Sequence, residues 1–381
     1  MGMNFDKREP LNCATIIRNP SSHGGGIAAV ALPLHIQLNE LGANANLVCV
    51  TKPEREVVNL FSIGKNGFGA LYLPKSVMRD VVHIHGIWTS FEIFLGMVAR
   101  RRGAKVIVSP HGALEPWAFK SKGFKKKLAW YLYQKKSLLN ADLLIVNSDQ
   151  ERDNLRALGL NGAIAVIPNG VVLDGYDKSS AVNIERSKVV LYFSRLDRKK
   201  GIELLVKSWK KIEDKRGYKL HIQGYGDEGY KRSLRELVSH LELNEYVEFI
   251  EPSYSGQRWV SFTNASIYIL PSYSENFGIT VAEALFSGLP SITTTEMPWK
   301  DLPKEKIGWS VKCNETDITQ ALTEAISLEE NELAKMRYNA IDYAEKRFLW
   351  KNIVKEYELV YRWVLQPSKE TMPNNVTTNI N

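Results

Sequence analysis

Residues 267–290 read IYILPSYSENFGITVAEALFSGLP, a strand, a loop and a helix joined in twenty-four positions. The first four residues are all apolar, which predicts a buried strand that ends at Pro271. A helix is expected to begin near Gly278, so that Glu275 lies just before it and Glu283 within its first turns. Backbone N–H groups at the start of a helix lack intrahelical partners and can bind an anion. The anion-binding positions predicted here are Phe277, Gly278, Ile279 and Thr280.

Strand-and-helix units of this kind recur along the chain. Apolar runs alternate with helical stretches at residues 13–18, 45–51, 81–85, 105–109 and 143–147, and again at 189–193, 220–223, 247–250, 267–270 and 291–294. Such alternation predicts parallel sheets with helices on both faces. We therefore predict an α/β protein with two doubly wound domains that face a cleft at the carboxyl ends of their strands, where such sheets bind ligands.

The boundary between the two domains is predicted at the turn-forming sequence Pro168-Asn169-Gly170. The first domain would span residues 1–170 and the second residues 171–345. An aromatic-rich helix at 346–366 is expected to cross back and pack on the first domain. The polar, Asn- and Thr-rich tail at 367–381 is expected to be disordered.

The composition is that of a globular protein, with 381 residues of which 44% are hydrophobic and 24% charged. These values exclude a disordered chain and a fibrous repeat. The net charge of +8 points to an acidic partner, either nucleic acid, an anionic membrane or a phosphorylated small molecule. Three distant cysteines exclude a disulfide framework, and with the polar N-terminus they lead us to expect a cytoplasmic protein.

A second charged element lies at residues 194–201, SRLDRKKG, between an apolar strand and an amphipathic helix. Cations near a helix N-terminus oppose the helix macrodipole, so Arg195 and Lys200 are expected to face an anion. A guanidinium fork and a compact ammonium suit a diphosphate. The simpler alternative is a solvent-exposed start of a helix.

The sequence GYGDEG at residues 224–229 matches G-x-G-x-x-G, after a strand and before a helix. This is the context of a dinucleotide fingerprint. The match lies in the second domain, however, and NAD binding is therefore disfavoured.

Together these motifs resemble those of the retaining family 4 glycosyltransferases, members of the glycosyl transferases group 1 that have the GT-B fold. Residues 271–290 resemble the family signature, and residues 194–201 resemble its Arg…Lys-Gly element. Three further matches follow in the family order: Ser109-Pro110-His111-Gly112 with its His-Gly loop, Pro168-Asn169-Gly170-Val171 with its interdomain segment, and Gly24-Gly25-Gly26 with its N-terminal glycine loop. The resemblance spans roughly residues 13 to 365.

The resemblance implies transfer of a sugar from a UDP- or GDP-sugar to a hydroxyl, with retention at the anomeric carbon. The implied catalytic residues are His111, Glu275, Arg195 and Lys200. Glu283 would accept the ribose hydroxyls, and Glu275 would contact hydroxyls of the donor sugar. His111 would lie by the anomeric carbon and stabilise the transition state through either its backbone carbonyl or its ring.

Further donor contacts are implied for four glycines, Gly25, Gly26, Gly224 and Gly226, for Asn276 and for residues 277–280. No D-x-D triplet and no His-x-x-x-His pair occurs in the sequence. The resemblance implies no metal and no cofactor, because the two cations would stabilise the leaving diphosphate instead.

Bacterial relatives with a loop like His111-Gly-Ala-Leu-Glu-Pro-Trp117 commonly build O-antigen, capsule or exopolysaccharide on a lipid diphosphate carrier. The resemblance thus implies a lipid-linked or other glycan acceptor. The acceptor-side candidates are His85, Trp88 and Trp117. His83 and His85 share one face of a strand, and the role of the pair is left open.

Residues 119–136 combine lysines with aromatic residues, a mixture typical of interfacial helices. This predicts peripheral binding to the anionic inner face of the plasma membrane. The membrane-surface candidates are Lys122, Lys125, Lys126, Lys127 and Trp130. The alternative is an ordinary surface helix with a buried aromatic stripe.

The positive charge is concentrated in one region. Residues 98–136 hold eleven lysines and arginines and one acid, so this stretch carries +10 and the rest of the chain −2. We therefore expect a membrane face and no nucleic-acid partner, although a basic nucleic-acid-binding protein stays a weaker alternative. A GT-B epimerase or phosphorylase would share the architecture and stays open as well.

Overall fold

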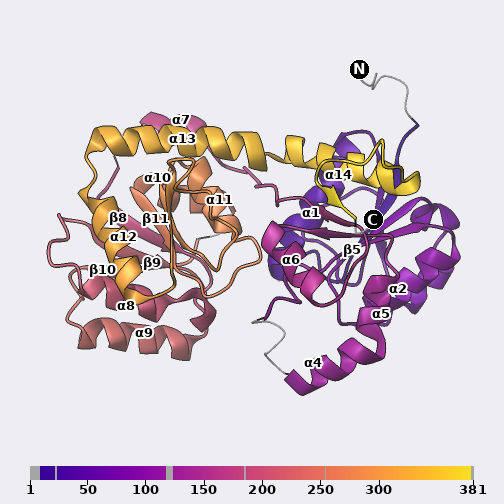
Figure 1. The fold of residues 1–381 in the computed structure, drawn as a ribbon, viewed down its shortest axis with the longest axis horizontal. Coiled ribbons are helices and arrows are strands. Elements are labelled where there is room, and N and C mark those ends of the chain that lie inside the picture. Colours follow the sequence, from indigo (N-terminus) through magenta and orange to yellow (C-terminus); the bar gives the residue numbers. More distant parts are fainter. Residues whose placement is uncertain (1–8, 22–23, 117–122, 184–185, 254, 379–381) are drawn as a thin grey trace. The chain divides into compact units, whose positions relative to one another are not determined.

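The computed structural model describes residues 9–21, 24–116, 123–183, 186–253 and 255–378. The chain divides into two compact units. Unit 1 comprises residues 1–170 and 350–381, and unit 2 comprises residues 171–349. Each unit is an α/β layer structure with a parallel sheet at its centre (Figure 1).

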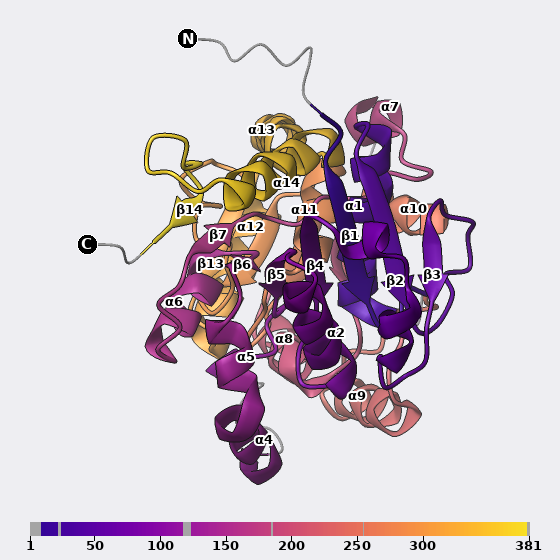
Figure 2. The same cartoon turned by 90° about the vertical axis from the view of Figure 1, so that its right-hand side faces the viewer.

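The sheet of unit 1 has the strand order β14-β7-β6-β5-β4-β1-β2-β3, which Figure 2 shows across the view. Its strands are β1 (Asn12–Ile17), β2 (Asn44–Cys49), β3 (Leu60–Ser62), β4 (Val81–His85), β5 (Lys105–Ser109), β6 (Leu143–Val146), β7 (Ile164–Val166) and β14 (Val376–Thr377). All neighbouring pairs are parallel except β14 and β7. Parallel pairing places the carboxyl ends of β4, β5, β6 and β7 along one edge.

The helices of unit 1 cover both faces of this sheet. They are α1 (Gly25–Glu40), α2 (Ser90–Arg101), α4 (Gly123–Ala129), η4 (Trp130–Gln134), α5 (Lys135–Leu139), α6 (Asp149–Ala157) and α14 (Trp350–Leu365), with short turns η2 (Phe68–Tyr72) and η3 (Lys75–Met78). One face packs apolar residues of α2, α5 and α6 against the strands, and the other packs α1. The segment from α4 through η4 to α5 is one continuous helical run with a π-helical turn in its middle.

The sheet of unit 2 has the order β10-β9-β8-β11-β12-β13. Its strands are β8 (Val189–Phe193), β9 (Lys219–Gln223), β10 (Val247–Ile250), β11 (Ile267–Leu270), β12 (Ser291–Thr294) and β13 (Gly308–Val311). Its helices are α7 (Lys178–Asn183), η5 (Arg198–Lys200), α8 (Ile202–Lys210), α9 (Glu228–His240), η6 (Ser255–Gln257), α10 (Arg258–Asn264), α11 (Ile279–Phe286), α12 (Glu315–Ser327) and α13 (Glu330–Phe348). Because β8 and β11 are neighbours, the loops that follow them lie side by side.

The predicted architecture of two doubly wound, Rossmann-like parallel sheets is confirmed. The last long helix differs from the expectation of one uninterrupted helix, because Leu349 is extended and separates α13 from α14. The extended backbone there forms a bridge with Val171, the residue at which the chain enters unit 2. α14 belongs to unit 1, where it lies against α1 (Figure 1).

The tail that we expected to be disordered carries a short strand instead. β14 pairs antiparallel with β7, and the guanidinium of Arg156 donates a hydrogen bond to the carbonyl of Thr377 (3.1 Å). Val376 is buried. The strand covers the open edge of β7, which explains why a polar tail becomes ordered.

Among the described residues, no helix has both the length and the apolar character needed to cross a membrane.

Candidate active site

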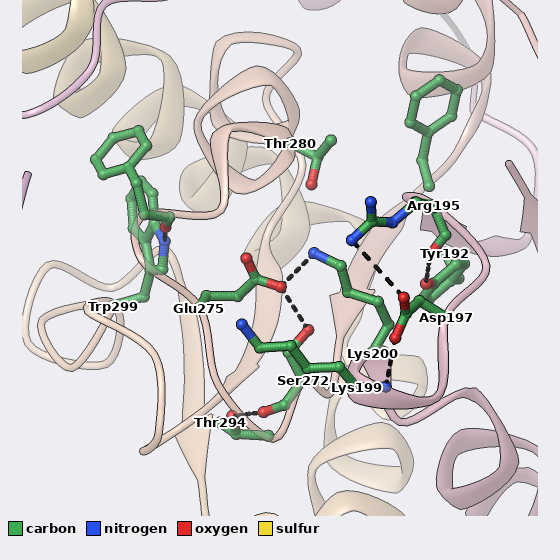
Figure 3. A network of polar contacts seen from close by, with 12 residues as sticks. Tyr192, Arg195, Asp197, Lys199, Lys200, Ser272, Glu275, Thr280, Thr294 and Trp299 are labelled. Carbon is green, nitrogen blue, oxygen red and sulfur yellow. Dashed lines mark hydrogen bonds and ion pairs between the residues drawn. The ribbon is translucent and has the colours of Figure 1, made fainter. Parts of the chain in front are cut away.

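The loops after β8 and β11 bring Lys200 and Glu275 together (Figure 3). The ammonium of Lys200 forms an ion pair with Oε1 of Glu275, and both side chains are largely buried. Ser272 donates a hydrogen bond to the same oxygen (3.0 Å), and its own carbonyl accepts one from Thr294 (2.6 Å). The sequence predicted both residues as catalytic, and the structure places them in direct contact.

Two backbone features hold these loops in contact. The N–H of Tyr273 donates to the carbonyl of Lys199 (2.9 Å). Gly201 has a φ of 70°, and a Cβ at that position would lie 2.1 Å from the carbonyl oxygen of Pro271. Only glycine permits this approach, so the Lys-Gly pair of the sequence motif has a structural cause.

Arg195 lies beside this pair but is more exposed. Its guanidinium is 3.7 Å from Asp197, at 56% side-chain exposure. Asp197 also caps η5 by accepting a hydrogen bond from the N–H of Lys199 (2.9 Å). The sequence predicted that an anion would offset the cations near this helix start. The carboxylates of Asp197 and Glu275 are two such anions within the protein itself. A bound diphosphate would compete with these two carboxylates for the cations.

Helix α11 begins at Ile279, directly after Gly278, whose φ is 77°. Gly278 provides no side-chain cap for this end, and its carbonyl accepts a hydrogen bond from the N–H of Val281 (2.9 Å). The indole N–H of Trp299 donates to the carbonyl of Phe277 and so fixes the peptide before the helix. The hydroxyl of Tyr268 donates to that of Thr280 (2.7 Å), which orients the Thr280 side chain.

Glu283 lies in the second turn of α11, where its carboxylate is 9% exposed. Nε of Arg258 is 3.0 Å from its Oε1. Burial raises the pKa of Glu283 to about 7, although the positive charge of Arg258 acts in the opposite direction. The site thus contains a carboxyl group that changes charge near neutral pH.

Gly224 and Gly226 have a structural role that is independent of any ligand. A Cβ on Gly224 would lie 1.8 Å from the carbonyl oxygen of Ser194, and one on Gly226 would lie 2.5 Å from that of Leu196. The chain between them continues the pairing of β8 with β9, since the N–H of Leu196 donates to the carbonyl of Tyr225 (2.8 Å). Close backbone packing therefore explains both glycines.

In unit 1, His111 follows β5 with a φ of 52°, an uncommon conformation for a residue with a side chain. The buried carboxylate of Glu151 accepts hydrogen bonds from the N–H of Gly112 (2.6 Å) and from the N–H of Asn147 (3.0 Å). These bonds hold the His111 loop onto the start of α6. The constraint offsets the backbone strain at His111.

The ring of His111 is also engaged on both sides. Its Nε2 is 2.9 Å from Nδ1 of His85, and the side chain of Asn147 provides a second hydrogen bond. The amide nitrogen of Asn147 already donates to Asn169 (2.7 Å) and to Ile167 (3.1 Å), so its oxygen is the acceptor for the imidazole N–H. Burial lowers the pKa of His111 to about 4, and the ring is neutral at physiological pH.

His83 has a structural role. Its two ring nitrogens contact the hydroxyls of Tyr361 (2.6 Å) and Ser109 (2.8 Å), which joins α14 to the sheet. His85 stacks beside it, with ring centres 4.0 Å apart, so the predicted shared face is confirmed. Among the hydrogen bonds of the described residues, one joins His85 to His111 and none joins His83 to His111.

The remaining sequence candidates lie at several places in unit 1. Gly25 and Gly26 form the start of α1, where an added Cβ would meet open space. The N–H of Trp88 donates to Gln134 (2.9 Å), which ties this loop to the α4–α5 helical run. Trp117 and Lys122 lie outside the described residues, as does the side chain of Lys125.

Residues 123–139, where a membrane-surface helix was predicted, are helical, but one of the predicted surface residues is buried instead. Trp130 is 4% exposed and packs in the core of unit 1, because its turn faces the sheet. Among the described side chains of this run, the large apolar ones that face solvent are Leu128, Tyr131, Leu132, Tyr133 and Leu139. Lys127 is exposed, and Lys126 lies over the ring of Trp88 at 5.8 Å.

Three residues of these sites were not predicted from the sequence, namely Arg258, Glu151 and Asn147. Arg258 lies far along the chain from Glu283, as do Glu151 and Asn147 from the His111 loop, and no local motif marks them. Asn147 was recognisable only as a polar residue at the carboxyl end of a predicted strand. Among the described residues, no three His, Cys, Asp or Glu side chains form a group that could hold a metal ion.

Two family models match this chain. The model described as glycosyl transferases group 1 matches residues 177–347, and the glycosyl transferase 4-like domain matches residues 79–170. The two matches fall in unit 2 and unit 1, respectively. They include the loops that hold Lys200, Glu275 and His111.

Relatives and solved structures agree with these matches. A GDP-mannose:cellobiosyl-diphosphopolyprenol alpha-mannosyltransferase from Xanthomonas oryzae pv. oryzae is 27% identical over 77% of this chain and 78% of its own length. Sucrose-phosphate synthase from Thermosynechococcus elongatus superposes with a TM-score of 0.74 at 20% identity, over 95% of this chain and 100% of that chain. Anabaena Alr3699/HepE in complex with UDP superposes with a TM-score of 0.71 at 16% identity, over 92% and 100%. Residues 177–347 are thus a domain of the glycosyl transferases group 1, residues 79–170 are a glycosyl transferase 4-like domain, and the chain has the GT-B fold of glycosyltransferases.

Proposed function

We propose that this protein moves a sugar from a UDP- or GDP-sugar to a hydroxyl of a lipid-linked glycan, with retention at the anomeric carbon. The observation that carries the proposal is the contact between Lys200 and Glu275 at the carboxyl ends of two neighbouring strands, with Arg195 beside it. A cation pair next to the N-terminus of α11 suits a diphosphate leaving group. In this proposal Lys200, Arg195 and the helix stabilise its charge without a metal ion or a cofactor.

The other residues have matching roles in the proposed reaction. Glu275 would exchange its bond to Lys200 for hydroxyls of the donor sugar, and Glu283 would accept the ribose hydroxyls. His111 would act through its backbone carbonyl, because both nitrogens of its ring are engaged by Asn147 and His85. A rigid carbonyl can stabilise the positive charge that develops on the sugar ring in the transition state.

For the acceptor, we propose a precursor of O-antigen, capsule or exopolysaccharide that is anchored in the inner membrane. The relative from Xanthomonas oryzae pv. oryzae is named for a diphosphopolyprenol acceptor. The surface of the α4–α5 run supports a membrane location at the cytoplasmic face, since Leu128, Tyr131 and Leu132 are exposed near Lys127. Apolar side chains with basic neighbours are typical of helices that lie in the membrane interface.

Replacing Lys126 and Lys127 with glutamate is expected to weaken binding to liposomes that contain anionic lipids. Each basic residue near such a surface contributes about 1 kcal/mol, so the loss of two predicts a reduction of roughly 30-fold or more. Cosedimentation with vesicles of phosphatidylglycerol and phosphatidylcholine measures it. Replacing Lys207 and Lys210 of α8 in unit 2 makes the same change in net charge and should leave binding unaltered. Equal binding by both double variants would contradict the membrane proposal.

A panel of UDP- and GDP-sugars tests the proposed reaction. With a membrane extract that supplies lipid-linked acceptors, one donor is expected to release its nucleoside diphosphate, at a rate that depends on the extract. Release that requires inorganic phosphate would indicate a phosphorylase. Conversion of the sugar nucleotide to its epimer without release would indicate an epimerase.

A further inference from the structure

Arg258, the first residue of α10, is held in place on three sides. Its Nε lies 3.0 Å from Oε1 of Glu283. One Nη donates to the carbonyl of Val172 (2.8 Å), and the guanidinium carbon lies 5.0 Å from the ring centre of Trp259. With a side-chain exposure of 18%, it is a fixed cation rather than a mobile surface charge.

The helices that carry Arg258 and Glu283 are both held by the segment through which the chain enters unit 2. The indole of Trp259 donates to the carbonyl of Asp174 (3.0 Å), which anchors α10. The hydroxyl of Tyr176 donates to the carbonyl of Phe286 (2.6 Å), the last residue of α11. The separation between the guanidinium and the carboxylate is therefore set by the backbone of α10 and α11.

Glu283 needs such a partner for the role that we propose for it. The two hydroxyls of a ribose are both donors, and an ionised carboxylate offers an acceptor on each oxygen, whereas a protonated one turns an oxygen into a donor. Burial favours the protonated, neutral form of this carboxyl group, and a nearby fixed cation favours the ionised form. A contact on Oε1 also limits the rotation of the carboxylate.

We infer that Arg258 is a positioning residue for nucleotide recognition, which fixes the orientation and the charge of Glu283 so that it receives the ribose hydroxyls of the donor. The inference rests on the donor-binding role proposed for Glu283. It assigns Arg258 no contact with the donor itself. Its effect must therefore depend on both Glu283 and the ribose hydroxyls.

The experiment is a calorimetric titration with UDP and GDP, followed by the 2′,3′-dideoxy analogue of whichever nucleotide binds more tightly. Arg258→Met is expected to raise the Kd of the ribonucleotide roughly tenfold or more, since it leaves a buried charge without its partner. The Kd of the dideoxy analogue, which lacks the hydroxyls, should change less than about twofold. The matched control is Arg235→Met, which removes an exposed arginine stacked on Phe249 and should alter neither value.

Two further variants separate positioning from a general loss of structure. In a Glu283→Gln background, Arg258→Met should add no further loss of ribonucleotide affinity. Arg258→Lys keeps the charge and should recover part of the affinity, and it replaces Arg258→Met in all comparisons if the latter does not fold. Equal losses for the ribonucleotide and the dideoxy analogue, or additive losses in the double variant, would overturn the inference. Binding of neither nucleotide by the unaltered protein would instead contradict the proposed function on which the inference rests.

Discussion

Replacing Lys200 with alanine is expected to lower kcat by roughly 100-fold or more, the usual effect of removing a single preorganised group that stabilises developing charge. The ammonium is largely buried and lies between two strand ends, where its charge is poorly screened by water. Its proposed partner in the transition state is the departing diphosphate. Because the diphosphate gains charge as it leaves, kcat should fall more than KM rises.

Lys199 provides the matched control for this experiment. It carries the same charge one residue earlier, and its backbone carbonyl, which alanine would keep, holds the N–H of Tyr273. Lys199→Ala is expected to keep kcat within about threefold of the unaltered protein, a difference below 1 kcal/mol in the barrier. Nucleotide release measures both variants, and a thermal melt checks that each is folded. A folded Lys200→Ala protein with near-normal kcat would contradict the assigned role of this lysine.

The affinity for the donor is expected to fall as the pH falls below 7. The pKa of Glu283 is raised to about 7, and the proposed contact with ribose needs the ionised form. Each pH unit below the pKa therefore lowers the ionised fraction, and kcat/KM for the donor at low concentration, by about tenfold. Above pH 8 the profile should be flat. The measurement is kcat/KM from pH 5.5 to 8.5, with Glu283→Gln as the control that removes the titration.

The carboxyl group of Glu283 should also affect the stability of the fold. Donor affinity increases as the pH rises toward 7, whereas this contribution to stability decreases. The pKa of Glu283 is higher in the folded protein than the ordinary value of 4.5, so between these values the folded state binds a proton that the unfolded state lacks. The contribution of Glu283 to the free energy of unfolding therefore decreases as the pH rises from 4.5 to 7. Arg258 is the charged neighbour that lowers the pKa of Glu283, whereas Glu283 helps to raise the pKa of Tyr268. A value of kcat/KM for the donor that rises as the pH falls would contradict the role assigned to Glu283.

Much of the fold could be predicted from residues 267–290 and the similar units around them, because buried parallel strands are short apolar runs that local sequence reveals. β3, β7, β13 and β14 were missed, since each lies at the edge of its sheet or has no more than three residues. The division between α13 and α14 was missed for a different reason. Leu349 is compatible with a helix, and its extended conformation depends on pairing with Val171 across the unit.

The site was predictable to the extent that its residues lie in contiguous motifs. Lys200 and Glu275 belong to two such motifs, and the neighbouring strands bring them together. Arg258 and Glu151 reach Glu283 and Gly112 through contacts between residues far apart in the chain, so no spacing in the sequence marks them. Trp130 shows the limit of composition, because an aromatic residue within a basic helix can face either the solvent or the core.

The central claim is that unit 2 presents a nucleotide-linked sugar whose anomeric configuration is kept on transfer. Proton NMR of the reaction mixture, with the donor selected from the UDP- and GDP-sugar panel and a lipid-linked acceptor, tests it most directly. The account predicts that the anomeric signal of an α-linked donor is replaced by a new α-glycosidic signal, in step with release of nucleoside diphosphate and without added metal. A β-linked product, or no consumption of any donor in the presence of acceptor, would contradict it.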